Sequence, residues 1–448
     1  MKRLTFIFAL ILCAAPAYAQ DIGTADTSIT SNQYFRDLRC AKCKQEKMTG
    51  HWQGTRIDLE DKGVTFASSY VADILGNTVG GRMQGARYCH SMGWDANFDL
   101  EKFAKLAGTQ FHISGIWRAG QNLTSAVIGN AFVVSSIFGH QQFRLYALYL
   151  EQALCDNRVN IRVGRIGAGD DFAAAPIYWN FVQNAIDGNP VSIPINLYFP
   201  TYPTATWGIR AKCNIIKDIY TISGLYNGDP NVQRDSAYGM DFTLRLKKKG
   251  LIFAQEIAYA PNTDKGCKGK GLPGIYKAGF YYHGGTFFDM SSDINGAPYV
   301  LTGLPAKKHI GNYNLYFHAE QMIYRKKGTD CDEGLTPFVV VTVGPENMNK
   351  FPFFLDGGLV YRGLIPTRKH DISAVGFAYG KYSDDMRHAE RDAGAPIQSY
   401  EFVVEFTHKI EITPWMFLQP DLQYIVNPSG AHNIDDAFVV GTRFGLTF

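Results

Sequence analysis

The feature that most constrains this chain is an alternation of apolar and polar residues over segments of about ten residues. In residues 400–412, one set of alternate positions is aromatic or aliphatic apart from His408, and the other carries Glu401, Glu405, Lys409 and Glu411. The same period of two runs through residues 251–260 and 415–424. Segments of this length and pattern cross a bilayer as tilted β-strands. The alternation therefore predicts an all-β protein whose strands have one apolar face.

Composition excludes other classes of protein. After the first twenty residues, no apolar run reaches the roughly 18 residues of a membrane helix, since residues 125–138 are interrupted by Gly129 and Asn130. Aromatic residues make up 14% of the chain, which is too many for a disordered protein. A net charge of +3 argues against nucleic acid as the main partner. The remaining choice is between a large soluble β protein and a membrane β-barrel.

Two features favour the barrel. Tyrosines gather near the predicted strand ends, as interfacial girdles require: Tyr259, Tyr281, Tyr282, Tyr361, Tyr379, Tyr382 and Tyr424. The chain also ends on an aromatic residue in strand phase, Phe448, which resembles the signal read by the outer-membrane barrel-assembly machinery. We therefore expect a transmembrane antiparallel β-barrel with short periplasmic turns and longer extracellular loops.

The N-terminus predicts export. Lys2 and Arg3 precede an apolar stretch at 4–15, and Ala17-Tyr18-Ala19 has the small-x-small form of a cleavage site. We expect a signal peptide at 1–19 cleaved after Ala19, a polar arm at 20–48, and a barrel domain at 49–448 in the bacterial outer membrane.

Cysteine usage leaves alternatives open. The chain has 8 cysteines, and cleavage would remove Cys13 and leave an odd number. Because exported proteins meet oxidising conditions, structural or inter-chain disulfides are the favoured interpretation. Cys40 and Cys43 could instead form half of a zinc site that His51 or Cys89 and His90 would complete, or a redox motif, although no second pair has ligand spacing.

Several segments resemble the OprB-type carbohydrate-selective porins. The segments that carry the resemblance are 49–56, 62–66, 163–165, 188–190, 363–366, 419–424 and 427–428. His51 and Gln53 stand where the family usually has Asp and Gly. The resemblance implies a barrel of about 16 strands, passive diffusion of small polar solutes, no cofactor, and no enzyme chemistry.

One branch of that family carries several cysteines: the arginine porins of an arginine/agmatine exchange system (AaxA type). This chain is similar to that branch in its cysteines and divergent opening segment, so the resemblance implies L-arginine as the solute. The alternatives are small sugars or general small solutes, a barrel enzyme, and a disulfide-cross-linked structural envelope protein. The partners to expect are outer-membrane lipid and either further copies of this chain or disulfide-linked envelope neighbours.

Charges in strand phase should face the lumen, because lipid-facing charges are costly. The alternation predicts these channel-lining residues: Glu256, Asp356, Arg362, Glu401, Glu405, Lys409, Asp421, Gln423 and Arg443, with Arg144, Arg162 and Glu411 in the same phase. Carboxylates would suit a guanidinium solute, although each charge could equally be an ion-pair member of the wall. Segments 166–171 and 180–202 are candidates to fold inward or to remain extracellular, with Arg165, Asp170 and Asp171 as candidate constriction residues. No metal site or catalytic residue is predicted.

Overall fold

The computed structural model describes residues 47–448 except 140, 245–249, 264–270 and 329–331. The predicted signal peptide and almost all of the predicted arm lie outside these residues. The same holds for Cys40, Cys43, Cys267 and Cys331.

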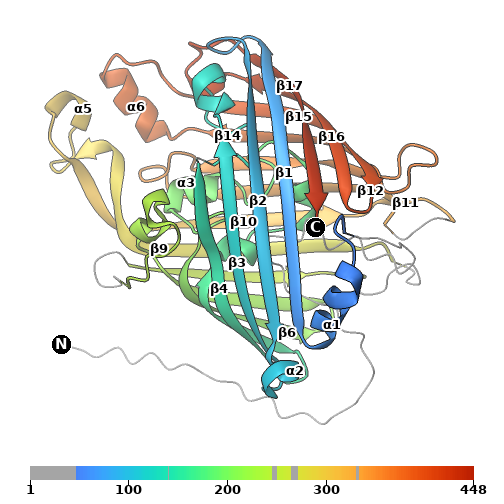
Figure 1. The fold of residues 1–448 in the computed structure, drawn as a ribbon. Helices are drawn as coiled ribbons and strands as arrows, with labels where there is room; N and C mark the ends of the chain where they lie inside the picture. Colours follow the sequence, from blue (N-terminus) through green and yellow to red (C-terminus); the bar gives the residue numbers. More distant parts are fainter. Residues whose placement is uncertain (1–46, 140, 245–249, 264–270, 329–331) are drawn as a thin grey trace, which may run out of the picture.

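The described strands form one antiparallel sheet that closes on itself through pairing of β1 with β17 (Figure 1). Sixteen strands build the wall, and a two-residue strand, β11, lies beside β12. Their bounds are β1 Val64–Val79, β2 Gly85–Asp99, β3 Thr109–Gly120, β4 Gln142–Leu154, β5 Val159–Ile166, β6 Thr206–Ile216, β7 Ile219–Asn227, β8 Leu251–Tyr259, β9 Gly274–Asp293, β10 Ala306–Gln321, β11 Tyr324–Arg325, β12 Gly334–Val343, β13 Phe353–Arg362, β14 Ile372–Lys381, β15 Tyr400–Thr413, β16 Met416–Val426 and β17 Ala437–Thr447. The predicted 16-stranded barrel is confirmed.

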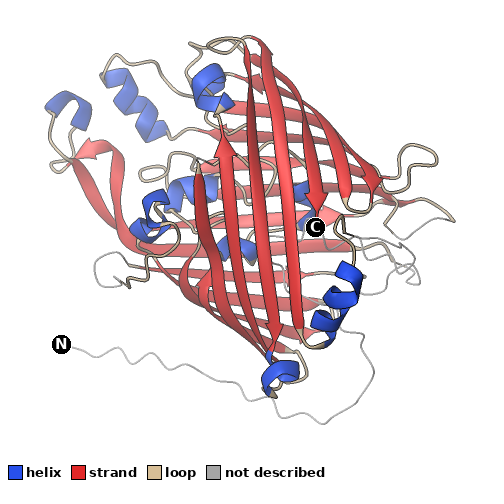
Figure 2. Ribbon diagram, viewed as in Figure 1, coloured by secondary structure: helices blue, strands red, loops and turns tan. Residues whose placement is uncertain are grey.

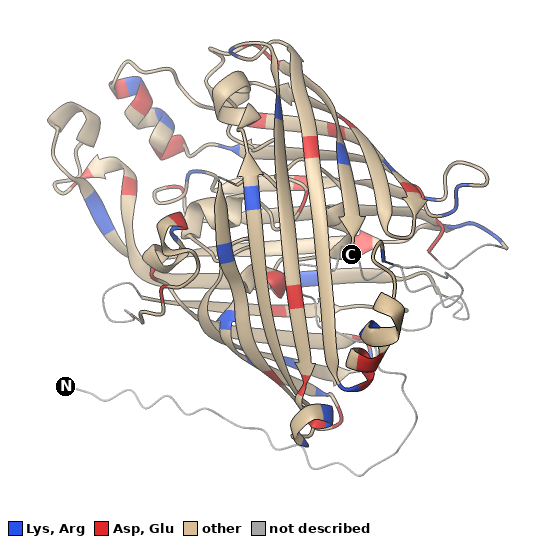
Figure 3. Cartoon of the chain, viewed as in Figure 1, with Lys and Arg blue, Asp and Glu red and all other residues tan. Residues whose placement is uncertain are grey.

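The strands bury one face and expose the other, as the alternation predicts. In β8, Leu251, Phe253, Ile257 and Tyr259 are exposed to the outside, whereas Glu256 between them is buried. Because closure leaves only two faces, the exposed apolar set is the lipid-facing surface and the buried set faces the lumen. Figure 3 shows long stretches of strand without charge, and charges gathered on helices at the ends of the barrel.

The two rims differ. At one rim the chain ends meet, since the backbone N–H of Met48 donates to the carbonyl of Thr447 at 2.8 Å, and the connections 217–218 and 414–415 are minimal turns. The opposite rim carries the long connections 121–141, 167–205, 228–250 and 382–399. This is the predicted arrangement of short periplasmic turns and longer extracellular loops.

The chain also forms short helices before and between the strands (Figure 2). They are α1 Thr55–Asp61, α2 Leu100–Ala104, α3 Ser192–Leu197, α5 Tyr299–Thr302 and α6 Asp384–Asp392. In the part of the chain that is described, no helix is both long and apolar enough to cross a membrane.

Two long connections fold into the barrel instead of remaining outside. We call 121–141 the first infolded segment and 167–205, which contains α3, the second infolded segment. Their apolar side chains, including Phe132, Phe172 and Phe181, are fully buried against the inner wall in two separate clusters. A barrel of this size would otherwise hold a wide aqueous lumen. The segments therefore narrow the passage, and polar wall residues decide where they lie.

Candidate functional site in the lumen

Glu401 of β15 holds the first infolded segment. Its carboxylate accepts the backbone N–H groups of Ala131 at 2.7 Å and Phe132 at 2.8 Å. It also accepts the N–H of Ser429, in the connection between β16 and β17, at 2.7 Å. A carboxylate has enough lone pairs for three donors. Glu401 therefore fixes the position of backbone across the lumen and lies where the alternation predicts, on the inner face.

Glu405, four residues along the same strand, holds the second infolded segment. Its two carboxylate oxygens accept the N–H groups of Val182 at 2.7 Å and Gln183 at 3.0 Å. Asp421 of β16 lies beside Glu405 and accepts the side-chain amide of Gln423 at 2.8 Å. That same amide donates to the carbonyl of Val134 at 2.9 Å. Glu405, Asp421 and Gln423 thus contact infolded backbone or one another.

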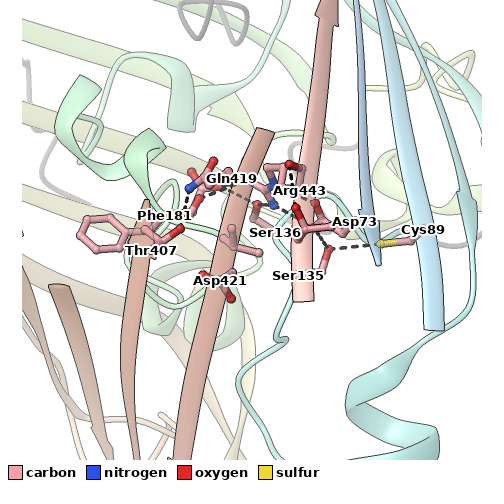
Figure 4. Close-up of polar contacts among 12 residues, drawn as sticks. Asp73, Cys89, Ser135, Ser136, Phe181, Thr407, Gln419, Asp421 and Arg443 are labelled. Carbon is pink, nitrogen blue, oxygen red and sulfur yellow. Dashed lines mark hydrogen bonds and ion pairs between the residues drawn. The ribbon is translucent and has the colours of Figure 1, made fainter. Parts of the chain in front are cut away.

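Arg443 of β17 joins both infolded segments to the wall (Figure 4). It is paired with Asp73 of β1 at 2.8 and 3.0 Å. It also donates to Ser136 at 2.9 Å in the first segment, and to the carbonyl of Phe181 at 3.1 Å and Asp187 at 3.2 Å in the second. Five acceptor contacts on one buried guanidinium use its planar fork fully.

The opposite wall uses ion pairs between side chains. Arg162 of β5 is fully buried and contacts Glu151 of β4 at 2.7 Å and Asp171 of the second segment at 3.4 Å. Arg210 of β6 contacts the same Asp171 carboxylate at 3.0 Å. The Arg162 guanidinium also lies 4.4 Å from the centre of the Tyr149 ring. Asp171 therefore anchors the segment through charge, in contrast to the amide contacts of Glu401 and Glu405.

Glu256 of β8 both accepts a backbone N–H and pairs with a charged side chain. It accepts the N–H of Ala173 at 3.1 Å and the hydroxyl of Tyr316, and it lies 3.5 Å from the Lys277 ammonium. Lys277 in turn donates to the carbonyl of Ala174 at 2.6 Å. Both residues therefore support the start of the second infolded segment.

A cavity of about 160 Å³ remains between the two infolded segments and the wall. Val71, Ile137, Ala174, Val191 and Pro194 give it apolar surface. Its aromatic and polar lining residues, four of them charged, are Ser69, Ser91, Arg118, Ser136, Asp170, Tyr178, Trp179, Asn184, Asp187, Asn189, Thr201, Tyr202 and Arg443. The guanidinium of Arg118 lies 4.9 Å from the centre of the Tyr202 ring. The side chains of Trp179 and Asn184 make no hydrogen bond to another described residue, so they are available to a solute.

Asp170 is a lining carboxylate that lies outside the strands and has a strongly perturbed pKa. Burial raises the pKa of its carboxyl to about 7, and the neighbouring charges of Asp171 and Asp95 act in the same direction. The hydroxyl of Tyr146 donates to Asp170, and Arg162 lies nearby; both oppose the shift. Asp170 can therefore change charge near neutral pH.

The remaining predicted lining residues have separate surroundings. Asp356 of β13 is buried and makes no hydrogen bond or ion pair with another described residue. Arg362, at the periplasmic end of β13, pairs with Asp332 at 2.7 Å. The Lys409 ammonium lies 4.4 Å from the centre of the Phe417 ring. Arg144 of β4 donates to Asp235 at 2.6 Å on the extracellular side.

Arg165 does not join Asp170 and Asp171. Val163, two residues earlier in β5, is half exposed on the outer face, and residues two apart in a strand share a face. The register partners of Arg165 are Leu148 and Trp207. Its place is therefore in the outward column of β5, and it stands apart from the lumen cluster.

Sequence reasoning treated the first infolded segment only as an interrupted apolar run. The available signal was that 125–138 is apolar without a period of two, between two alternating segments. Such a run is too short for a membrane helix and has no strand pattern, so it requires an apolar surface inside the barrel. The second segment was foreseen as inward or extracellular, and the structure places it inside.

Metal and disulfide chemistry find no support in the described residues. Cys89, Cys155 and Cys213 are free thiols, and no group of three or more metal-ligating side chains occurs in the described parts of the chain. Cys89 is buried, and its thiol lies 3.2 Å from the hydroxyl of Ser135, which donates to Asp73 at 2.7 Å (Figure 4). This thiol belongs to the network around Arg443.

Comparison with known proteins supports a porin. Residues 83–448 match the family model described as carbohydrate-selective porin, OprB family. The opening segment at 49–66 lies before this match. Porin B of Pseudomonas aeruginosa is 28% identical over 423 residues, which cover 90% of this chain and 91% of that protein.

Solved structures show the same architecture. The high-pH structure of Pseudomonas putida OprB superimposes with a TM-score of 0.85 at 28% identity, covering 91% of this chain and all of that one. The outer-membrane channel DcaP of Acinetobacter baumannii, at 9% identity and a TM-score of 0.51, covers 86% of this chain and shares the fold alone.

Proposed function

The chain belongs to the OprB family of carbohydrate-selective porins, and on that premise we propose that its solutes are small, neutral, polyhydroxylated molecules of the sugar class. The family and the fold are those of outer-membrane channel proteins, not of enzymes. The observation that carries the solute proposal is the lining of the cavity between the infolded segments.

This lining fits a polyhydroxylated solute. Trp179, Tyr178 and Tyr202 offer aromatic surfaces for the apolar faces of a sugar ring, and Asn184 offers both donor and acceptor groups to hydroxyls. A few convergent polar groups on a largely apolar lining are typical of sites for small molecules. Because Trp179 and Asn184 make no side-chain hydrogen bond to another described residue, a solute would compete with no existing partner.

The alternative solute, L-arginine, requires carboxylates that are available to a guanidinium. Glu401 and Glu405 instead accept backbone N–H groups, and Asp171 is paired with two arginines. Asp356, which has no partner among the described residues, does not line the cavity. Neither Porin B nor OprB of Pseudomonas putida is named for arginine. These observations favour the sugar class over the arginine/agmatine assignment.

The test is uptake by liposomes that contain the purified protein. We expect glucose to enter faster than arginine or agmatine at equal concentration, and Trp179→Leu to slow glucose several-fold while arginine entry is unchanged. Trp117→Leu is the matched control, since Trp117 is exposed on the outer face. Arginine entry faster than glucose, or equal slowing by the two variants, would return the proposal to the arginine or general-pore alternative.

We also propose that export uses a leader cleaved after Ala19, and that Phe448 directs barrel assembly. The C-terminal strand supports the second point, because the Phe448 N–H donates to the carbonyl of Ser68 in β1 at 2.9 Å and so helps to complete closure. Sequencing the N-terminus of the mature protein, and measuring outer-membrane yield after Phe448→Ser, would check the two statements.

A further inference from the structure

The wall has a local gap at the extracellular end of β5. β5 leaves the sheet at Ile166, but β4 continues past their last register pair, Leu148 with Arg165. The gap is filled by residues 238–243 from the connection between β7 and β8. The Leu145 N–H donates to the carbonyl of Tyr238 at 3.0 Å, and a Cβ on Gly239 would lie 2.0 Å from the Leu145 oxygen.

The other side of this patch contacts β6 and β7. The Phe242 ring lies 5.5 Å from the Trp207 ring, and the Asn227 side chain donates to the carbonyl of Thr243 at 3.0 Å. Residues 238–243 therefore lie between β4 and β6 and cover the end of β5.

Arg165 lies beneath this cover with unused donors. It is 0% exposed, and among the described residues its side chain makes one hydrogen bond, from Nε to the Leu145 carbonyl at 3.4 Å. Its Nη1 and Nη2 have no hydrogen-bond partner in the described part of the chain, and neither does Nε1 of Trp207, its register neighbour in β6. Buried N–H groups without acceptors are rare and costly. Three unpaired donor atoms on two adjacent residues point to an acceptor that the described residues do not supply.

The nearby carboxylates do not supply that acceptor. Asp235 is hydrogen-bonded to Arg144 at 2.6 Å. Asp241, on the covering patch, accepts the N–H of Thr243 at 3.0 Å. Asp241 is close enough to interact electrostatically with Arg165, but no hydrogen bond joins either carboxylate to Nη1 or Nη2 of Arg165 in the described part of the chain.

The surroundings place Arg165 at the outer membrane interface. Exposed aromatic side chains lie on the patch, Tyr238 and Phe242, and at the extracellular ends of β3 and β4, Trp117 and Phe143. Aromatic girdles mark the level of the lipid headgroups, where phosphates lie. This rim is opposite the one where the chain ends meet, so the facing leaflet is the outer one.

We propose that Arg165 and Trp207 form a binding site for the phosphate of a phosphorylated outer-leaflet lipid, which enters when residues 238–243 move aside. A guanidinium presents paired donors that match phosphate oxygens, and the indole N–H adds a third. The outward column of Arg165 and the flanking exposed rings suit an acyl-bearing ligand better than a soluble anion. The site is separate from the lumen and does not depend on which solute passes.

The experiment measures binding of bis-phosphorylated lipid A to the purified full-length protein in detergent by native mass spectrometry. We expect Arg165→Gln to weaken binding at least tenfold and Trp207→Phe about threefold, since the latter keeps the ring and loses the N–H. Arg87→Gln is the matched control, because Arg87 is a half-buried arginine near the same rim, and it should leave binding unchanged.

Two further arms separate the sources of the phosphate. Dephosphorylated lipid A should bind the wild-type protein weakly, with about the affinity that the Arg165→Gln variant has for the phosphorylated lipid. Millimolar inorganic phosphate should displace little of the phosphorylated lipid from the wild-type protein. Equal binding of the two lipids, full displacement by inorganic phosphate, or unchanged binding by a folded Arg165→Gln variant would each overturn the proposal. Trp207→Phe provides the second reading if Arg165→Gln does not fold.

Discussion

The two sides of the barrel hold the infolded segments by different means. On β15, Glu401 and Glu405 accept backbone N–H groups. Across the lumen, Arg162 and Arg210 on β5 and β6 bind the side chains of Glu151 and Asp171. We call these the amide-holding wall and the ion-pair wall. The first fixes backbone position whatever the local side chain, whereas the second depends on matched charges at particular residues.

The difference predicts unequal costs of substitution. Removing one member of a buried ion-pair network leaves an uncompensated charge. Replacing a carboxylate that binds neutral amide groups with a neutral side chain removes hydrogen bonds but leaves no unpaired ion. The ion-pair wall should therefore be the more sensitive of the two.

The largest effect is expected from Arg162→Met. It leaves Glu151 and Asp171 with Arg210 as their shared cation and should lower the free energy of unfolding by about 3–5 kcal/mol. Urea unfolding in detergent or lipid would measure it. Arg362→Met is the control, since its partner Asp332 is half exposed, and should cost at most about 1 kcal/mol. Equal losses of unfolding free energy in the two variants would mean that burial of an ion pair does not raise the cost of breaking it.

The next effect is expected from Glu405→Gln, at about 1–3 kcal/mol. Glutamine keeps one acceptor oxygen but turns an amide group toward an N–H donor of the second segment. That segment should loosen, and single-channel conductance should rise or become noisy. Glu411→Gln, on the same strand near its periplasmic end, should leave conductance unchanged. A cost equal to that of Arg162→Met would erase the distinction between the two walls.

A pH effect should arise from Asp170, which lies next to the ion-pair wall. Because the pKa of its carboxyl is raised to about 7, the group is ionised above that pH and neutral below it. The preference of the pore for cations should therefore fall as pH falls through about 7, as reversal potentials would show. The contribution of Asp170 to the free energy of unfolding should fall as pH rises from about 4 to about 7. The reason is that the folded state keeps the Asp170 proton up to a higher pH than the unfolded state does.

The variants for this prediction separate Asp170 from the surface acids. Asp170→Asn should give a reversal potential that no longer changes near pH 7, while Asp384→Asn on α6 should behave as wild type. A pH response that persists in Asp170→Asn would assign the titration to another group, such as Asp187, whose pKa burial also raises.

The smallest effect is expected from Lys409→Met. The ammonium lies over the Phe417 ring, and methionine retains most of the apolar stem, so the cost should be below about 1 kcal/mol. Thermal unfolding would detect it as a shift of a few degrees at most. A larger shift would show that Lys409 holds a wall contact comparable to those of Glu405.

The alternation in the sequence determined the barrel and the inward face of the strand charges that hold the infolded segments, whereas Arg165 lies in the outward column of β5. Because side chains in a strand alternate sides, Glu256, Glu401, Glu405, Asp421 and Arg443 could be placed inward without knowing the register. The family resemblance added the strand number and the porin class. The comparisons do not support the arginine branch, because cysteine content and a divergent opening segment carry no information about the lumen.

The tertiary structure alone decided what those charges contact. The Glu405 carboxylate and the Val182 N–H are 223 residues apart in the chain, and they meet only because the barrel closes and the connection between β5 and β6 folds inward. The same closure leaves a gap above β5 and places residues 238–243 over Arg165. A local pattern fixes the direction of a side chain, but its partner across the lumen depends on the closed barrel and on the path of each loop.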